Sequence, residues 1–200
     1  MLSFSGSAAA DDRVVHGVET DFDPNSDQEI KQFFKQLGEV EKEENRVEVH
    51  ESLGKPQSNA ITEVLNEIEY KTEVNSPIES GLSIQSTGTS VSAKVTAKHW
   101  ALGYTVWSFE YKVEWDYDQN EVSNINEIER PNTSDPTWSA DGESGSNWLN
   151  VDSDEWHGRS QHKFSYIGGG TVPTLEMTPW VELTGNANGV GSVVDKSNGD

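Results

Sequence analysis

Residues 103–118 read GYTVWSFEYKVEWDYD, and from Trp107 to Tyr117 every second side chain is aromatic or valine. The positions between them carry serine, lysine, glutamate or aspartate. A period of two is typical of a β-strand that buries one face and leaves the other in water. The segment therefore predicts a long antiparallel strand. An aromatic row of this kind favours core packing over a sugar-stacking platform.

The flanking sequence predicts further strands joined by turns. Residues Asp118–Asn120 indicate a turn, after which Val122–Glu129 is expected to return as the hairpin partner. Ser90–Lys98 alternates in the same way, whereas the polar stretch 131–146 is expected to be a loop. Pro179 indicates an edge strand or a bulge. Additional strands are expected at residues 147–151, 161–167 and 174–183, with a last short one near 190–194.

Two amphipathic stretches precede the strands. Ser26–Leu37 opens with an S-x-x-E capping box and repeats apolar residues at helical spacing, so it predicts a helix that stops at Gly38. A second helix is expected over Asn59–Glu69, and the charged segment 39–53 is expected to be partly helical. Both apolar stripes are expected to pack within the molecule, with docking onto another protein as the alternative.

These elements predict an α+β fold: an antiparallel β-sandwich or open barrel preceded by a short two-helix segment. Two hundred residues suit one domain with an appended segment. The expected division is a signal-peptide remnant or disordered arm at 1–10, a helical lead-in at 11–75 and an antiparallel β domain at 76–200.

The chain carries 35 acidic and 14 basic residues, a formal net charge of −21, spread along its whole length. Phosphate binding needs clustered lysine and arginine, so the charge argues against nucleic acid and against anionic membrane surfaces. A uniformly acidic surface repels itself in dilute salt, and molar salt screens that repulsion within about 3 Å. The composition favours a protein of a salt-rich medium over an ordinary acidic mesophilic protein.

The first residues give an expectation about export. Ser7–Ala10 is a small-residue stretch like those that precede a signal-peptidase cut, and acidic residues begin at Asp11. We therefore expect a secreted, extracellular protein whose signal peptide is truncated or removed, with a disordered polar arm as the alternative. No apolar run predicts insertion into a membrane. Without cysteine, the fold depends on packing alone.

Three tryptophans are the candidate binding residues. Trp138, Trp148 and Trp156 lie in or beside polar segments, where a large aromatic side chain either closes the edge of a sandwich or stays exposed as an anchor for a ligand. Both interpretations remain open at this point. His157 follows directly and is included in the candidate ligand-binding set.

A possible ion site overlaps this region. Asp152, Asp154 and Glu155 offer hard oxygen ligands at close spacing, which calcium accepts, although the spacing is not that of an EF-hand. Chance clustering in so acidic a chain is the alternative, and calcium is the only cofactor indicated. The spacing of His157 and His162 does not match a zinc motif. Asn132 begins an N-glycosylation sequon, Asn-Thr-Ser.

The sequence indicates no catalytic constellation. It contains no G-x-S-x-G elbow, no P-loop and no G-x-G-x-x-G. A pair of carboxylates could serve a glycosidase, but the sequence does not single out such a pair. The three glycines 168–170 are expected to form a flexible turn between strands.

Part of the sequence resembles a known group of proteins. Residues 97–109, AKHWALGYTVWSF, resemble a pattern found in small exported β-rich proteins of haloarchaea. The resemblance covers about residues 90–195 and implies a secreted β-rich domain without an assigned function, so it transfers no functional residue. Its later landmarks are Trp115-Asp116-Tyr117, Trp138-Ser139, Arg159-Ser160 with Lys163-Phe164, and Pro179-Trp180-Val181.

The resulting functional expectation is a secreted, non-enzymatic binding protein of a halophile that acts through aromatic residues in loops. Its partner would be an extracellular protein or a glycan, and the oligomeric state is left open. The alternatives are a halocin-like antimicrobial protein, a carbohydrate-binding or carbohydrate-active protein, and a surface filament subunit that assembles through an edge strand.

Overall fold

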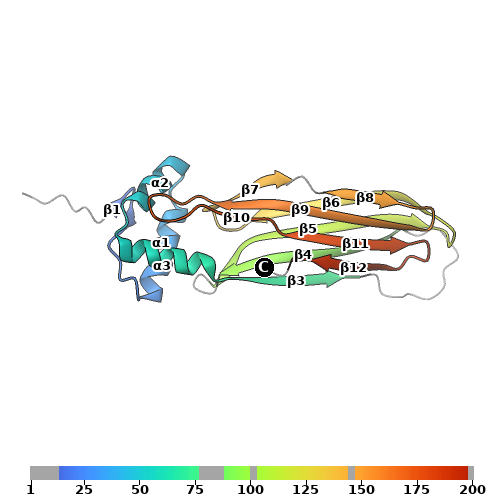
Figure 1. Cartoon of the computed structure of the whole chain (residues 1–200), viewed down its shortest axis with the longest axis horizontal. Helices are drawn as coiled ribbons and strands as arrows, with labels where there is room; N and C mark the ends of the chain where they lie inside the picture. Colours follow the sequence, from blue (N-terminus) through green and yellow to red (C-terminus); the bar gives the residue numbers. More distant parts are fainter. Residues whose placement is uncertain (1–13, 77–87, 100–102, 144–146, 198–200) are drawn as a thin grey trace, which may run out of the picture. The chain divides into compact units, whose positions relative to one another are not determined.

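The structure is a computed structural model that describes residues 14–76, 88–99, 103–143 and 147–197 (Figure 1). The chain is divided into two compact units. The helical unit contains the residues up to Asn66 together with Ile167–Thr174, and the β unit contains Glu67–Tyr166 and Leu175–Asp200. The described residues include no helix long and apolar enough to cross a membrane.

The helical unit is built around the predicted amphipathic helices. Its elements are β1 (Val14–Val15), β2 (Val18–Glu19), α1 (Asp27–Gly38), α2 (Glu43–Glu51) and α3 (Lys55–Asn66). The hydroxyl of Ser26 accepts a hydrogen bond from the backbone N–H of Glu29 at 3.4 Å, so the predicted helix cap is confirmed. The carboxylate of Glu29 departs from a reciprocal box, because it accepts from the N–H of Asp23.

The second predicted helix is displaced in the structure. Helix α3 begins at Lys55, four residues earlier than expected, and Pro56 lies in its first turn, where the fixed proline φ suits a helix. It ends at Asn66, and the prediction that Ile68 belongs to this helix is wrong. Ile68 instead opens strand β3 opposite His99.

The glycine segment 168–170 has a packing role in the helical unit. A β-carbon at Gly169 would lie 2.7 Å from the carbonyl oxygen of Val47 and 3.1 Å from Cβ of His50, both in α2. Gly170 has a φ of 58° and lies against Glu51. The segment, predicted only as a flexible turn, is therefore fitted closely to a helix.

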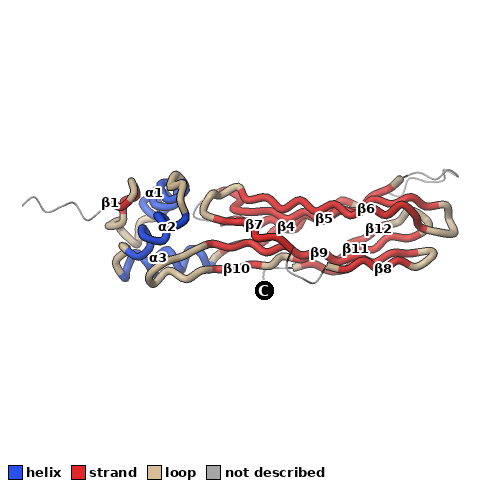
Figure 2. The backbone as a smooth tube through the Cα atoms, turned by 90° about the horizontal axis from the view of Figure 1, so that it is seen from above, coloured by secondary structure: helices blue, strands red, loops and turns tan. Residues whose placement is uncertain are grey.

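The β unit contains two antiparallel sheets that are not closed into a barrel, and Figure 2 shows the two layers of strands. The first sheet has the order β3-β4-β5-β6. Its strands are β3 (Ile68–Asn75), β4 (Thr89–His99), β5 (Tyr104–Tyr117) and β6 (Val122–Thr133). The predicted central strand and its hairpin partner are confirmed as β5 and β6.

The second sheet is organised around one long strand, β9. Its order is β10-β9-β11-β12, and β7 and β8 also pair with β9, at 162–166 and 156–159 respectively. Its strands are β7 (Trp138–Glu143), β8 (Trp148–Val151), β9 (Glu155–Tyr166), β10 (Leu175–Met177), β11 (Trp180–Asn186) and β12 (Gly191–Lys196).

The core of the β unit is aromatic. Trp107 on β5 stacks on Phe164 of β9, with ring centroids 4.5 Å apart and planes 7° apart. Trp115 meets Trp156 edge to face at 5.1 Å. Such pairs contribute about 0.5–1.5 kcal/mol each beyond the area they bury. The alternating row in β5 is therefore core, as its spacing predicted.

Two predictions about the later strands need correction. The stretch 131–146, expected to be a loop, contains the end of β6 and the whole of β7. Pro131 contributed to the prediction of a loop, but an edge strand tolerates a residue without a backbone N–H. The single strand expected at 174–183 is split into β10 and β11, and Pro179 lies between them.

Candidate functional site

The edge strand β6 directs carboxylates towards the inner side of the sandwich. Glu127 pairs with Val113 and Glu129 with Tyr111, so these two glutamates lie on the same face of the sheet as the buried residues of β5. In a sheet with water on one side, charged side chains such as these usually point into the water. This inversion produces an acidic opening along one side of the β unit.

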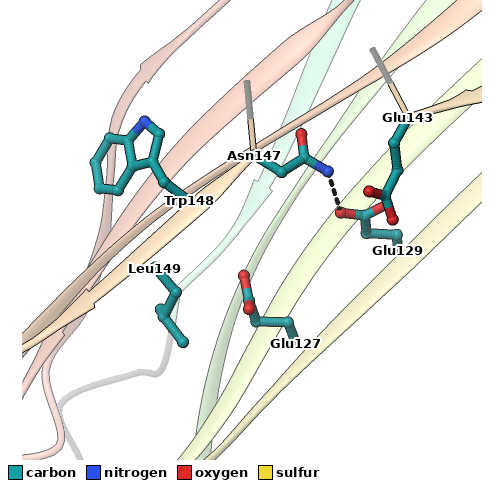
Figure 3. Close-up of a pocket in the computed structure, with 6 residues that line it drawn as sticks. All are labelled: Glu127, Glu129, Glu143, Asn147, Trp148 and Leu149. Carbon is teal, nitrogen blue, oxygen red and sulfur yellow. Dashed lines mark hydrogen bonds between the residues drawn. The ribbon is translucent and has the colours of Figure 1, made fainter. Parts of the chain in front are cut away.

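That opening is a cleft of about 510 Å³, which we call the acidic cleft (Figure 3). Its lining residues come from β6, from β7 and from the start of β8: Glu127, Glu129, Glu143, Asn147, Trp148 and Leu149. Figure 3 shows the carboxylates of Glu129 and Glu143 close to the Asn147 amide, with Glu127 set apart from them and the indole of Trp148 pointing away.

Asn147 joins the two sheets at this place. Its Nδ2 donates to Oε1 of Glu129 at 3.0 Å, and its Oδ1 accepts from the backbone N–H of Gln161 at 2.9 Å. The hydroxyl of Ser160, a fully buried residue of β9, donates to the same oxygen of Glu129. Both partners hold the Glu129 carboxylate in a fixed orientation.

The surroundings of the cleft shift two pKa values. Burial raises the pKa of Glu129, the hydrogen bond from Ser160 opposes this, and the charges of Glu143 and Glu127 add to it. The phenol of Tyr111 donates to Oε1 of Glu127 at 2.5 Å. Burial, together with that hydrogen bond, raises the pKa of Tyr111 well above its ordinary value.

A second surface begins at Trp148. In the register of β8 and β9, Trp148 lies opposite Arg159, on the face of the sheet that points away from the core. The guanidinium carbon of Arg159 lies 4.2 Å from the ring centroid of Trp180 on β11, a cation–π contact. Trp148 is 36% exposed and Trp180 is half-buried. We call these three residues the Trp148 face.

The other two candidate tryptophans are core residues. Trp156 is fully buried against Trp115, and Trp138 is 5% exposed and packs on Tyr166 at 5.7 Å. For both, the interpretation as an exposed anchor is corrected, because their positions in β7 and β9 direct them inward. Of the three, only Trp148 is exposed to solvent.

The remaining candidates lie at the surface. Asp152, Asp154 and Glu155 are exposed in and beside the turn between β8 and β9. Nε2 of His157 lies 3.5 Å from Glu155 Oε1. Among the described residues, no three carboxylate or imidazole groups converge as a metal ion would require. Asn132 is exposed on β6, and its Nδ2 contacts Ser134 Oγ at 3.3 Å.

The glutamates of the cleft and the partners of Trp148 were not predicted as site residues. Glu127 and Glu129 are two residues apart in a predicted strand, which indicates a shared face but not which face. Arg159 and Trp180 appeared only as landmarks of the haloarchaeal resemblance. Their juxtaposition depends on β9 lying between β8 and β11, and the local sequence does not specify that strand order.

Comparison of the chain with models of protein families, with curated proteins and with solved structures found no match. A functional assignment therefore has to come from the chemistry of the chain itself. Carboxylates accept hydrogen bonds from hydroxyl groups, an amide both accepts and donates them, and an exposed indole offers a flat apolar surface. The two features adjoin at β8. Asn147 directly precedes this strand, and Trp148 is its first residue.

Proposed function

We propose that this protein is an extracellular, non-enzymatic binding protein that holds a neutral glycan on the Trp148 face and in the adjoining acidic cleft. The observation that carries the proposal is the exposed indole of Trp148, which lies opposite Arg159, the residue that contacts Trp180. Tryptophan and arginine are the residue types that most often dominate binding energy at interfaces.

The chemistry of the two surfaces favours a glycan. The C–H groups on one face of a sugar ring can pack against an indole, and its hydroxyl groups can pair with carboxylates and amides in a cleft. The cleft supplies Glu127, Glu143 and the bridging Asn147. The net charge of −21 disfavours sulfated or uronic-acid polymers, which leaves a neutral chain as the ligand class.

The hydrogen bonds that Glu127 and Glu129 accept within the protein favour binding over catalysis. Oε1 of Glu129 accepts hydrogen bonds from Ser160 and Asn147, and Glu127 accepts one from Tyr111. A general acid or base must exchange its proton with a substrate. Groups that are already held by the protein are better suited to fixing the shape of a cleft.

The acidic composition supports the extracellular, salt-rich part of the proposal. Of the few basic residues, several are held in ion pairs, such as Lys163 with Glu176 at 2.6 Å and Arg130 with Glu110 at 3.1 Å. The remaining carboxylate excess is tolerated best where salt screens it.

The test is a screen of the full chain on an array of neutral and anionic glycans in roughly molar salt. We expect retention on at least one neutral glycan and at least a tenfold loss of affinity in Trp148→Ala, with the fold unchanged because this side chain is exposed. The matched control is Val151→Ala, three residues along the same strand and 52% exposed, which should bind like the native chain.

Three outcomes would overturn the proposal. One is the absence of binding to every glycan, and another is native affinity in Trp148→Ala. The third is retention of a protein partner by the Trp148 face while no glycan competes. A release of reducing sugar by the native chain that is lost in Glu129→Gln would reject the non-enzymatic part and favour the carbohydrate-active alternative.

A further inference from the structure

The strands at the edges of the two sheets differ in how they are protected. An unprotected edge strand presents unpaired N–H and C=O groups that can pair with another chain. On β6, Glu127 and Glu129 point inward and Pro131 removes a backbone donor. Inward charges and proline are two devices that prevent further pairing on an edge.

The edges of the second sheet are irregular. Strand β12 pairs Asp195 with Glu182 and Val193 with Leu183, so Val194 has no counterpart in β11 and forms a bulge. On the other side of β9 the edge is made of two short strands, β7 and β8. Short, bulged strands are poor templates for another strand.

Strand β3 lacks these protections. Its eight residues pair with β4 from Ile68 to Asn75 without a shift of register and without proline or glycine. Its inward positions are the uncharged Tyr70, Thr72 and Val74, and Val74 is 46% exposed. No other described strand pairs with its free side.

The sequence of β3 is complementary to itself in the antiparallel direction. If a second copy pairs with β3 so that the two Thr72 residues face each other, Lys71 lies opposite Glu73 in both halves. In the same register Tyr70 lies opposite Val74. Opposite charges and aromatic–β-branched pairs across strands each contribute roughly 0.2–1 kcal/mol. A twofold contact of this kind repeats every favourable pair twice.

We propose that two copies of the chain associate through β3, antiparallel about Thr72, and join their first sheets into one continuous sheet. Backbone hydrogen bonds supply the cohesion, and the Lys71–Glu73 pairs set the register. Within one chain these two side chains already form an ion pair at 2.8 Å, with about 60% of each exposed to solvent. The charge of −21 on each copy opposes association, so the dimer requires salt.

The experiment is light scattering coupled to size exclusion at roughly molar salt, where the chain is expected to be folded, over a range of protein concentrations. The native chain should have the mass of a dimer at the higher concentrations and should dissociate to a monomer on dilution. Lys71→Glu and Glu73→Lys should each be monomeric at high salt, because like charges then face each other. Mixing these two variants should restore a dimer, and so should the double exchange K71E/E73K.

The matched control is Lys112→Glu. Lys112 and Glu114 form an ion pair with the same spacing at 2.5 Å, but on the central strand β5, so this variant should keep the native mass. Circular dichroism of each variant verifies folding. A native chain that is monomeric at every concentration in this salt overturns the proposal. A Lys71→Glu variant that dimerises like the native chain, or a mixture that stays monomeric, overturns it equally.

Discussion

Gly158 on β9 lies under the hydroxyl of Tyr111 on β5, so closely that a β-carbon at residue 158 would lie 2.5 Å from that oxygen. The missing side chain makes room for a phenol in the centre of the sandwich. Tyr111 can therefore be fully buried and still donate to Glu127 at the cleft. One glycine thus links the core to the candidate binding site.

Gly158→Ala should lower the free energy of unfolding of the β unit by about 1–3 kcal/mol, the usual cost of overpacking a core. The cost should be much smaller in a Tyr111→Phe background, because the nearest atom is then gone. A double-mutant cycle in urea measures this coupling. Equal costs of Gly158→Ala in the two backgrounds would show that Tyr111 does not occupy this space.

Gly169→Ala tests the packing of segment 167–174 within the helical unit. The new methyl group would meet the carbonyl oxygen of Val47, a backbone atom that cannot rotate away. We expect the free energy of unfolding to fall by about 1–3 kcal/mol. The unfolding is measured by the far-UV circular dichroism of the helices. The control, Gly88→Ala, meets only the side-chain tip of Asp116 at 3.3 Å and should change stability by less than about 0.5 kcal/mol. Similar midpoints for the two variants would contradict the account.

Stability should fall as the pH is lowered from 7.5 to 5. Burial lowers the pKa of His50 to about 4 from an ordinary value of 6.5, so below pH 6.5 the unfolded chain binds a proton that the folded chain does not. Its contribution is complete above pH 6.5, and about 2 kcal/mol of it is lost at pH 5. Burial also lowers the pKa of His162, which acts in the same direction.

His50→Leu separates this effect from other titrations. His50 is 1% exposed and packs beside Phe33, with ring centroids 6.0 Å apart, so leucine can occupy the same apolar surroundings. As the pH falls from 7.5 to 5, the urea midpoint of the native chain should fall relative to that of the variant. A constant difference between them over this range would show that His50 does not titrate on unfolding.

Local periodicity predicted the elements whose partners are near in sequence. The cap at Ser26 and the alternation in β5 depend on spacings of three and two residues, and both are confirmed. Ile68 continues the helical spacing of α3 but pairs with His99, a residue 31 positions later. Pairing of β3 with β4 outweighs the preference of Ile68 for the helical spacing. Residues 59–69 alone do not indicate this pairing, because the partner strand lies outside them.

The candidate site was harder to predict for a related reason. Trp138, Trp148 and Trp156 have similar polar neighbours, yet the first and last are buried and Trp148 is exposed. The difference comes from which face of β7, β8 or β9 each one occupies. A change of one residue in register would reverse it. Burial of a tryptophan beside a polar segment is thus set by strand pairing, not by its neighbours.

The salt dependence of folding tests the origin of the acidic surface. Circular dichroism and tryptophan fluorescence should show loss of structure below roughly molar salt, because the carboxylate repulsion is then unscreened. The control is the same series at a constant osmotic pressure set with a neutral solute. Full stability in salt-free buffer would contradict the proposal that a salt-rich medium shaped this composition.

The most direct test of the proposed binding surface is quenching of tryptophan fluorescence by acrylamide, with and without a retained glycan. The part of the quenchable signal that disappears in Trp148→Phe belongs to Trp148, which is 36% exposed. We predict that the glycan protects this part from acrylamide in the native chain. A bound glycan that leaves the Trp148 signal as quenchable as before would show that the binding surface lies elsewhere.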